Sequence, residues 1–143
     1  MTLLIKTLAI VAVLIGGLTS PVLAGPPTFI YPVTLDRVVD GDTMDFRMEI
    51  FPSIYKDARI RVANFDAAET WRPSTEAERA HGQAATERAI ELLQPPLHIR
   101  VYGWGVLNRV RADIILPDGL DFATVMIEEG YEKRDEYFYP QQE

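Results

Sequence analysis

The stretch Val39–Asp45, which reads VDGDTMD, places three carboxylates within six residues. Asp40 and Asp42 flank Gly41, and an Asp-Gly pair between two strand-like segments predicts a tight hairpin turn. Side chains at such a turn project beyond the end of the strand ladder. The cluster is therefore either an ordinary solvated turn or part of a metal site, and residues elsewhere in the chain decide between the two.

A second acidic pair, Asp66 and Glu69, follows the third strand-like segment. If the two strand ends meet, each unscreened pair of like charges at about 4 Å costs on the order of 4 kcal/mol at an effective dielectric constant near 20. A bound cation or a raised carboxyl pKa must offset that repulsion. Because both stretches lack histidine and cysteine, the all-oxygen donor set favours calcium or magnesium over zinc.

Two arginines accompany the acids. Arg61 precedes Asp66 by five residues, and Arg109 lies at the last long strand-like segment. Guanidinium groups bind phosphate with paired hydrogen bonds. A cation and two guanidinium groups can neutralise a phosphate while a spare carboxylate positions or activates water. The combination predicts phosphoryl-transfer chemistry, which the acidic turn alone does not.

These residues resemble the motifs of the staphylococcal nuclease (thermonuclease) family. The motifs, in order, are Val-Val-Asp40-Gly-Asp42-Thr43, Arg61-Val-Ala-Asn-Phe-Asp66-Ala-Ala-Glu69-Thr, and Arg109-x-x-Ala112 ahead of Asp118-Gly119. The match covers about residues 33 to 132. It implies an OB-fold barrel, a bound Ca2+ ion and hydrolysis of DNA or RNA phosphodiester bonds, with the 5′-oxygen leaving and 3′-phosphate products.

The resemblance also implies a set of calcium ligands. By position, Asp42 and Asp66 would bind the ion directly, together with the backbone carbonyl of Ala67. Asp40 and Thr43 would act through water or by supporting those ligands. The family position of Ala67 usually holds threonine or another small residue. Because the ligand there belongs to the main chain, alanine is compatible with the role.

The implied catalytic residues are Arg61, Glu69 and Arg109. Glu69 would be the general base for the attacking water, by removing its proton or by orienting it. The two arginines would hold the scissile phosphate and stabilise the charge that develops on it.

Two departures from the family pattern concern nucleotide binding. The segment Gly105–Asn108 replaces an Asp-x-Tyr-Gly run before the second arginine, and Glu136 and Phe138 stand where tyrosines are expected. Exposed aromatic side chains could stack unpaired bases instead, although core packing is the alternative for each. The candidates are Tyr102, Trp104 and Tyr131.

Trp71 and Arg72 follow Glu69 closely and could border a substrate. A tryptophan that anchors the loop explains the same residues equally well.

Alternation of apolar and polar residues predicts five strands. Together with the helices described below, the expected order is β-β-β-α-β-β-α, which suits a small closed barrel better than a sandwich. The resemblance specifies an OB-fold Greek-key barrel, a mainly β fold of the α+β class. The strands are expected over residues 31–39, 42–50, 58–65, 97–102 and 109–116.

Two helices complete the predicted fold. The capping box Thr75-x-x-Glu78 begins a long helix between the third and fourth strands, and Pro95-Pro96 ends it. Asp121 caps a short C-terminal helix that Gly130 closes.

The first 24 residues have the plan of a secretory signal peptide: one lysine, the apolar run Leu8–Leu18, and Ala24 before Gly25. The apolar run is short for a bilayer core of about 30 Å, although an uncleaved anchor stays the alternative. Residues 25–32 are expected to be a linker and 33–143 the nuclease domain. We expect a secreted or periplasmic protein without membrane contact after cleavage. The absence of cysteine excludes disulfides and lipid attachment at a cysteine.

The chain has 14 lysine and arginine residues against 21 aspartate and glutamate residues, a formal net charge of −7. This charge argues against a passive binder of polyanions and predicts weak nucleic-acid binding with a shallow salt dependence. We expect a monomeric enzyme. The alternatives are an OB-fold interaction module of the cell envelope with little turnover, and a calcium-stabilised structural domain, which would leave Arg61 and Arg109 unexplained.

Overall fold

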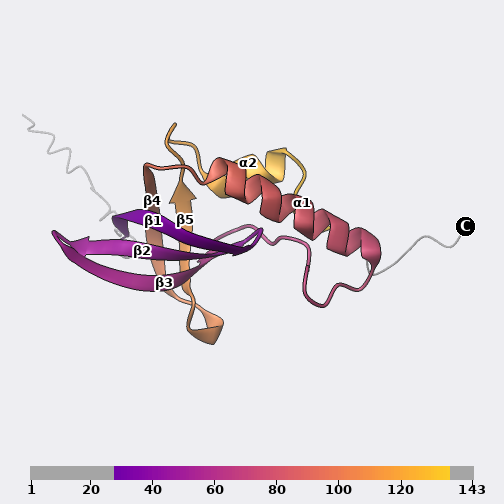
Figure 1. The fold of residues 1–143 in the computed structure, drawn as a ribbon, viewed down its shortest axis with the longest axis horizontal. Coiled ribbons are helices and arrows are strands. Elements are labelled where there is room, and N and C mark those ends of the chain that lie inside the picture. The colour runs from indigo at the N-terminus through magenta and orange to yellow at the C-terminus, as the bar shows by residue number, and fades with distance from the viewer. Residues whose placement is uncertain (1–27, 136–143) are drawn as a thin grey trace, which may run out of the picture.

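Five strands form a closed barrel in the computed structural model, which describes residues 28–135 (Figure 1). The barrel order is β1-β2-β3-β5-β4, with β4 pairing back to β1. Only the β3–β5 pair is parallel. The strands are β1 (Phe29–Asp40), β2 (Thr43–Phe51), β3 (Ile54–Val62), β4 (Leu97–Trp104) and β5 (Val110–Ile115).

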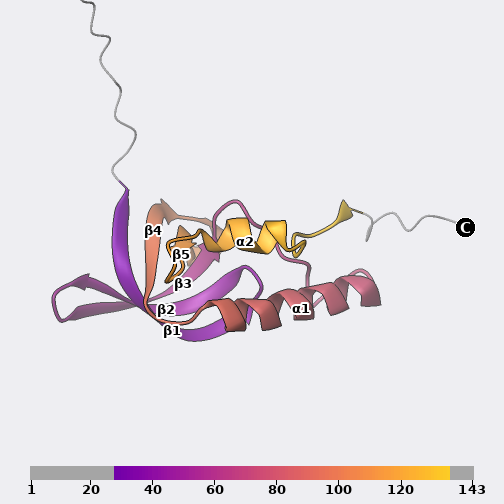
Figure 2. The same ribbon diagram turned by 90° about the horizontal axis from the view of Figure 1, so that it is seen from above.

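Two helices lie side by side at one end of the barrel in both views (Figures 1 and 2). Helix α1 (Glu76–Leu92) connects β3 to β4, and α2 (Phe122–Glu128) follows β5. A short 3-10 turn, η1 (Val106–Asn108), joins β4 to β5. The predicted element order and the OB-fold-like barrel of the α+β class are confirmed. No helix within residues 28–135 is long and apolar enough to span a bilayer.

Alternate residues of the strands supply the core, as the sequence pattern predicts. Helix α1 closes the barrel with small side chains, since Ala85 and Ala89 are fully buried. Its first turn is capped by Thr75, whose Oγ1 accepts a hydrogen bond 3.1 Å long from the backbone N–H of Glu78. The fully buried apolar side chains of the strands include Met44, Phe46, Ile60, Ile99 and Ile114.

Three expected boundaries differ from the structure. Strand β1 begins at Phe29, so the last four residues of the expected linker pair with β4. Strand β3 begins at Ile54, so only two residues separate it from the end of β2. The turn is this tight because Ser53 adopts a left-handed φ of 65° and reverses the chain. The β1–β2 turn consists of Gly41 and Asp42 rather than Asp40 and Gly41. The expected signal peptide, together with Glu136 and Phe138, lies outside the described residues.

Candidate active site

Asp42 lies at the centre of the candidate site and is buried, with 2% of its surface exposed. Its Oδ2 accepts a hydrogen bond 2.7 Å long from the backbone N–H of Ala67. Its Oδ1 accepts one from the Thr43 hydroxyl at 2.9 Å and another from the guanidinium of Arg61. One carboxylate thus joins the β1–β2 turn to β3 and to the chain that follows β3.

Gly41 provides the space for this arrangement. A Cβ atom at Gly41 would lie 2.8 Å from the Cβ of Ala67 and 2.9 Å from the Cβ of Ala85 in α1. Glycine is therefore required here by the close approach of these segments. It is not required by the backbone conformation, because the φ of Gly41 is not in the left-handed region. The turn, α1 and the segment after β3 are packed against one another at this point.

Arg61 joins the two aspartates that the sequence places 24 residues apart. It pairs in register with Thr43 across β2 and β3, next to the acidic turn. Its guanidinium donates one hydrogen bond to Asp42 and another to Asp66. The Asp66 side chain is 73% exposed, so the bridge runs from the interior to the surface.

The positive charge near Asp42 is too small to keep the pKa of this carboxyl at its usual value. The backbone N–H of Asp42 donates to Oδ1 of Asp40 at 3.2 Å, which brings the two acids together. Burial, reinforced by a side-chain hydrogen bond and repulsion from Asp40, raises the pKa of Asp42 to about 7, against the opposing attraction of Arg61. An additional cation near these carboxylates would favour their charged forms.

A cavity of about 140 Å³ gathers most of the predicted site residues. Glu69 faces it together with Asp40 and Asp42, and Lys133 adds a cation to which the sequence assigned no role. The lining residues are Asp40, Asp42, Arg61, Ala67, Ala68, Glu69 and Lys133.

A buried glutamate holds the loop that carries Glu69. Glu78 is 1% exposed and accepts hydrogen bonds from the backbone N–H of Ser74 at 2.6 Å and of Glu69 at 3.4 Å. Lys133 lies 2.9 Å from the same carboxylate. The hydrogen bond from Lys133 is the main reason why the pKa of Glu78 falls to about 2. In the predicted capping box this carboxylate was expected to serve only the helix start, whereas its hydrogen bonds position the preceding loop.

Arg109 faces a second cavity, of about 430 Å³, which it shares with Arg61 and Arg111. Gly105 completes the lining. Arg61 lines both this cavity and the acidic one, so it connects the carboxylates to a group of three guanidiniums. Two or three guanidiniums around one cavity suit a phosphate group.

The donor atoms fit a hard cation such as calcium, because all of them are carboxylate or carbonyl oxygens around a carboxyl group of raised pKa. Within residues 28–135, however, no three His, Cys, Asp or Glu side chains are grouped closely enough to hold a metal ion. Arg61 contacts both Asp42 and Asp66. An ion and this guanidinium would compete for the same two carboxylates.

Three residues of the site were not assigned to it from the sequence. Lys133 lies beyond α2, and no local pattern indicates that it returns to the β1–β2 turn. It does so because the backbone N–H of Lys133 donates to the carbonyl of Asp66 at 2.8 Å. Arg111 alternates with core residues on β5, a signal that indicated exposure but no function. Glu78 was recognised only as a helix cap.

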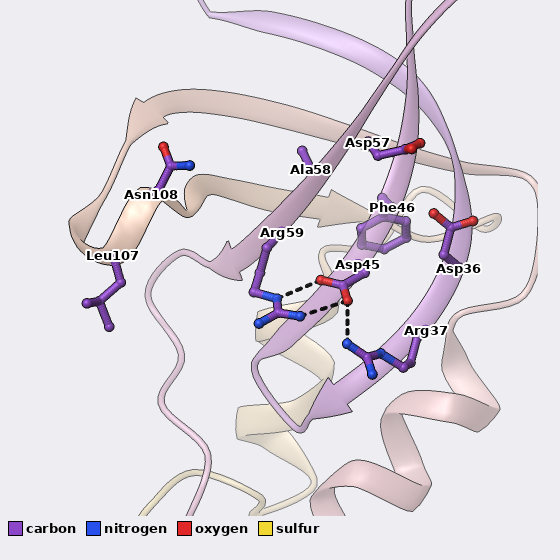
Figure 3. A pocket seen from close by; sticks show the side chains of 9 residues that line it. All are labelled: Asp36, Arg37, Asp45, Phe46, Asp57, Ala58, Arg59, Leu107 and Asn108. Carbon is purple, nitrogen blue, oxygen red and sulfur yellow. Dashed lines mark hydrogen bonds and ion pairs between the residues drawn. The ribbon is translucent and has the colours of Figure 1, made fainter.

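A cavity larger than these two lies elsewhere, on the outer side of β1, β2 and β3 next to η1 (Figure 3). It measures about 520 Å³, and none of the predicted site residues lines it. Asp45 lies between Arg59 and Arg37, and the hydrogen bond from Arg59, followed by the one from Arg37, lowers the pKa of Asp45 to about 2. With three aspartates and two arginines in its lining, this cavity is a poor site for a phosphate.

No protein-family model matches the chain, and a comparison with curated proteins finds no significant match.

Proposed function

We propose that the protein is an exported, calcium-dependent nuclease that hydrolyses phosphodiester bonds of DNA or RNA. The observation that carries this proposal is the position of Arg61, which contacts Asp42 and Asp66 and also lines a cavity with Arg109. Carboxylates for a cation and guanidiniums for a phosphate are thereby adjacent. A carboxylate that could act on water, Glu69, lies on the acidic side of Arg61.

Asp42, Asp66 and the carbonyl of Ala67 would hold the calcium ion, with Asp40 and Thr43 supporting them. When bound, the ion would supply positive charge for the phosphate and lower the pKa of a water molecule. Glu69 would orient that water or accept its proton. The hydrogen bond from the backbone N–H of Trp71 to Oε1 of Glu69, at 2.9 Å, fixes the direction of the carboxylate.

Arg61 would change partners during this reaction. In the structure its guanidinium neutralises the two aspartates that a cation would otherwise bind. With those carboxylates held by an ion, Arg61 would be available to the cavity that it shares with Arg109. Both arginines would then hold the phosphate oxygens and stabilise the charge that builds up in the transition state.

The test is release of acid-soluble nucleotides from single-stranded and duplex DNA and from RNA, with calcium or with a chelator. Glu69→Gln should lower turnover by about 10²- to 10⁴-fold without altering thermal stability, because Glu69 is exposed. Glu76→Gln is the matched control, since Glu76 is an exposed glutamate in the first turn of α1. Cleavage products should end in 3′-phosphates. Absence of turnover at every calcium concentration would refute the proposal.

The contact between Arg61 and its two aspartates also supports a second candidate, an OB-fold interaction module without useful turnover. Arg61 satisfies both carboxylates without an ion, and the net charge of −7 disfavours polyanion binding. A module of this kind would keep its fold in chelator and bind its partner without hydrolysis. The same assay, read alongside oligonucleotide binding, separates the two candidates.

A further inference from the structure

Trp71 is exposed, with 77% of its surface accessible, although it lies only two residues from Glu69. The sequence left open whether this tryptophan anchors its loop or borders a substrate. An anchoring role requires a buried ring, which the structure does not have. A lone exposed apolar side chain is common on protein surfaces, so exposure alone indicates no function.

The loop that carries Trp71 is held at both ends. The carboxylate of Glu78 accepts from the backbone N–H of Glu69 at 3.4 Å and of Ser74 at 2.6 Å, one residue on either side of the segment 70–73. The backbone N–H of Trp71 donates to Glu69 at 2.9 Å. The ring therefore extends from a constrained loop at a defined place beside the proposed general base.

Arg72 covers one face of the Trp71 ring. Its guanidinium carbon lies 4.1 Å from the ring centroid, a stacked cation–π arrangement. With 77% of the residue still exposed, the opposite face is open to solvent. A flat, open aromatic face backed by a guanidinium offers stacking to a planar base and positive charge to the adjoining phosphate.

We infer that Trp71 and Arg72 form a stacking platform for an unpaired base next to the phosphate that the proposed site holds. The inference rests on the proposed function for the position of that phosphate. Bases within a duplex stack on one another and do not present their faces to a side chain, whereas unpaired bases do. The preferred substrate is thus single-stranded nucleic acid or a frayed end, with little dependence on base identity.

The chain contains only two tryptophans, which allows a direct test. In the double variant Glu69→Gln, Trp104→Phe, Trp71 is the sole tryptophan fluorophore. The loss of Glu69 prevents hydrolysis of the oligonucleotide during the titration. Titration with a single-stranded oligothymidylate in calcium should quench its emission saturably. A duplex with the same number of phosphates should require at least about fivefold higher concentrations.

Affinity measurements on the Glu69→Gln background complete the experiment. Trp71→Ala should weaken oligothymidylate binding by about five- to 150-fold, the range that one stacked base contributes. Trp71→Phe should retain most of the affinity, because it keeps an aromatic face. Phe51→Ala is the matched control, since Phe51 is also an exposed aromatic residue but stands at the end of β2.

Failure of this inference and failure of the nuclease proposal give different results. Calcium-dependent hydrolysis with unchanged Trp71 emission, or equal quenching by single strands and duplex, overturns the stacking platform and leaves the nuclease. The opposite result is that the strand quenches Trp71 and Trp71→Ala loses affinity, but the protein that retains Glu69 does not hydrolyse nucleic acid. This result supports the platform and overturns the nuclease.

Discussion

The buried carboxylate of Asp42 accepts a hydrogen bond from the guanidinium of Arg61. Arg61 forms an ion pair with Asp42 and another with Asp66. An arginine thus stands where the family resemblance expects a calcium ion. Calcium binding at these carboxylates would therefore depend on this competition and on the packing that keeps the carboxylates in place.

Calcium should stabilise the chain. A cation that binds the folded protein alone adds about 2.7 kcal/mol to the free energy of unfolding at 100 times its dissociation constant. Thermal melting with calcium and with chelator measures the gain. Asp42→Asn should abolish it, whereas Asp57→Asn, at an exposed aspartate paired with Arg47, should preserve it. An equal gain in both variants would place calcium at another site.

Arg61 and Arg109 should differ in their effect on stability but not on activity. Arg61→Gln leaves the Asp42 carboxylate buried without its ion-pair partner, which should lower the free energy of unfolding in chelator by about 2 kcal/mol or more. Arg109 makes no ion pair among the described residues, so Arg109→Gln should leave stability nearly unchanged. Both variants should lose about 10²- to 10³-fold in turnover. Urea denaturation in chelator, combined with the nuclease assay, distinguishes the two roles.

Gly82→Ala should disturb the loop of Glu69 through packing. A Cβ atom at this position in α1 would lie 2.5 Å from the carbonyl oxygen of Ala68 and 2.7 Å from Cγ2 of Thr70. Alanine ordinarily stabilises a helix interior by about 1 kcal/mol relative to glycine. Here the clash with the backbone should reverse the sign and cost about 1–3 kcal/mol, with reduced turnover.

Gly105→Ala is the steric control for that stability measurement. The nearest atom to its added Cβ would be the Arg109 carbonyl oxygen at 3.5 Å, an ordinary contact. A Gly82→Ala variant that melts at a higher temperature than the unsubstituted chain would contradict the close packing of α1 on the Glu69 loop.

The order of the elements follows from local signals in the sequence. Alternating apolar residues identify the strands, Thr75 caps α1, and Pro95-Pro96 follows its end. The start of β3 was missed because the reversal at Ser53 uses a left-handed φ of 65°, which non-glycine residues adopt rarely. Local patterns cannot indicate a turn that uses an uncommon backbone conformation.

The residue types of the site were indicated by the sequence, but their environment was not. Asp42 was expected to project from the end of a hairpin, whereas α1 and the chain after β3 bury it. Its burial depends on contacts between residues far apart in sequence, such as Gly41 and Ala85. The return of Lys133 to the Asp66 backbone depends on the path of the chain after α2, which alternation and capping patterns do not specify.

The ion pair between Glu78 and Lys133 should produce a pH-dependent contribution to stability. The pKa of Glu78 falls from its usual 4.5 to about 2 on folding, first because of the hydrogen bond from Lys133 and then because of backbone N–H donors. A folded pKa below the unfolded one stabilises the protein above pH about 4.5, and that stabilisation is lost as the pH falls towards 2. The shift corresponds to a contribution on the order of 3 kcal/mol near neutrality.

Glu78→Gln should therefore be less stable than the unsubstituted chain by a constant amount above about pH 5.5, and the difference should shrink on acidification. Urea denaturation at several pH values measures it, with Glu76→Gln as the exposed glutamate in the same helical turn. Because the Glu78 carboxylate holds the loop of Glu69, Glu78→Gln should also lower turnover, whereas Glu76→Gln should not. A stability difference that widened in acid would mean that Glu78 is not held in its charged form by Lys133 and the loop.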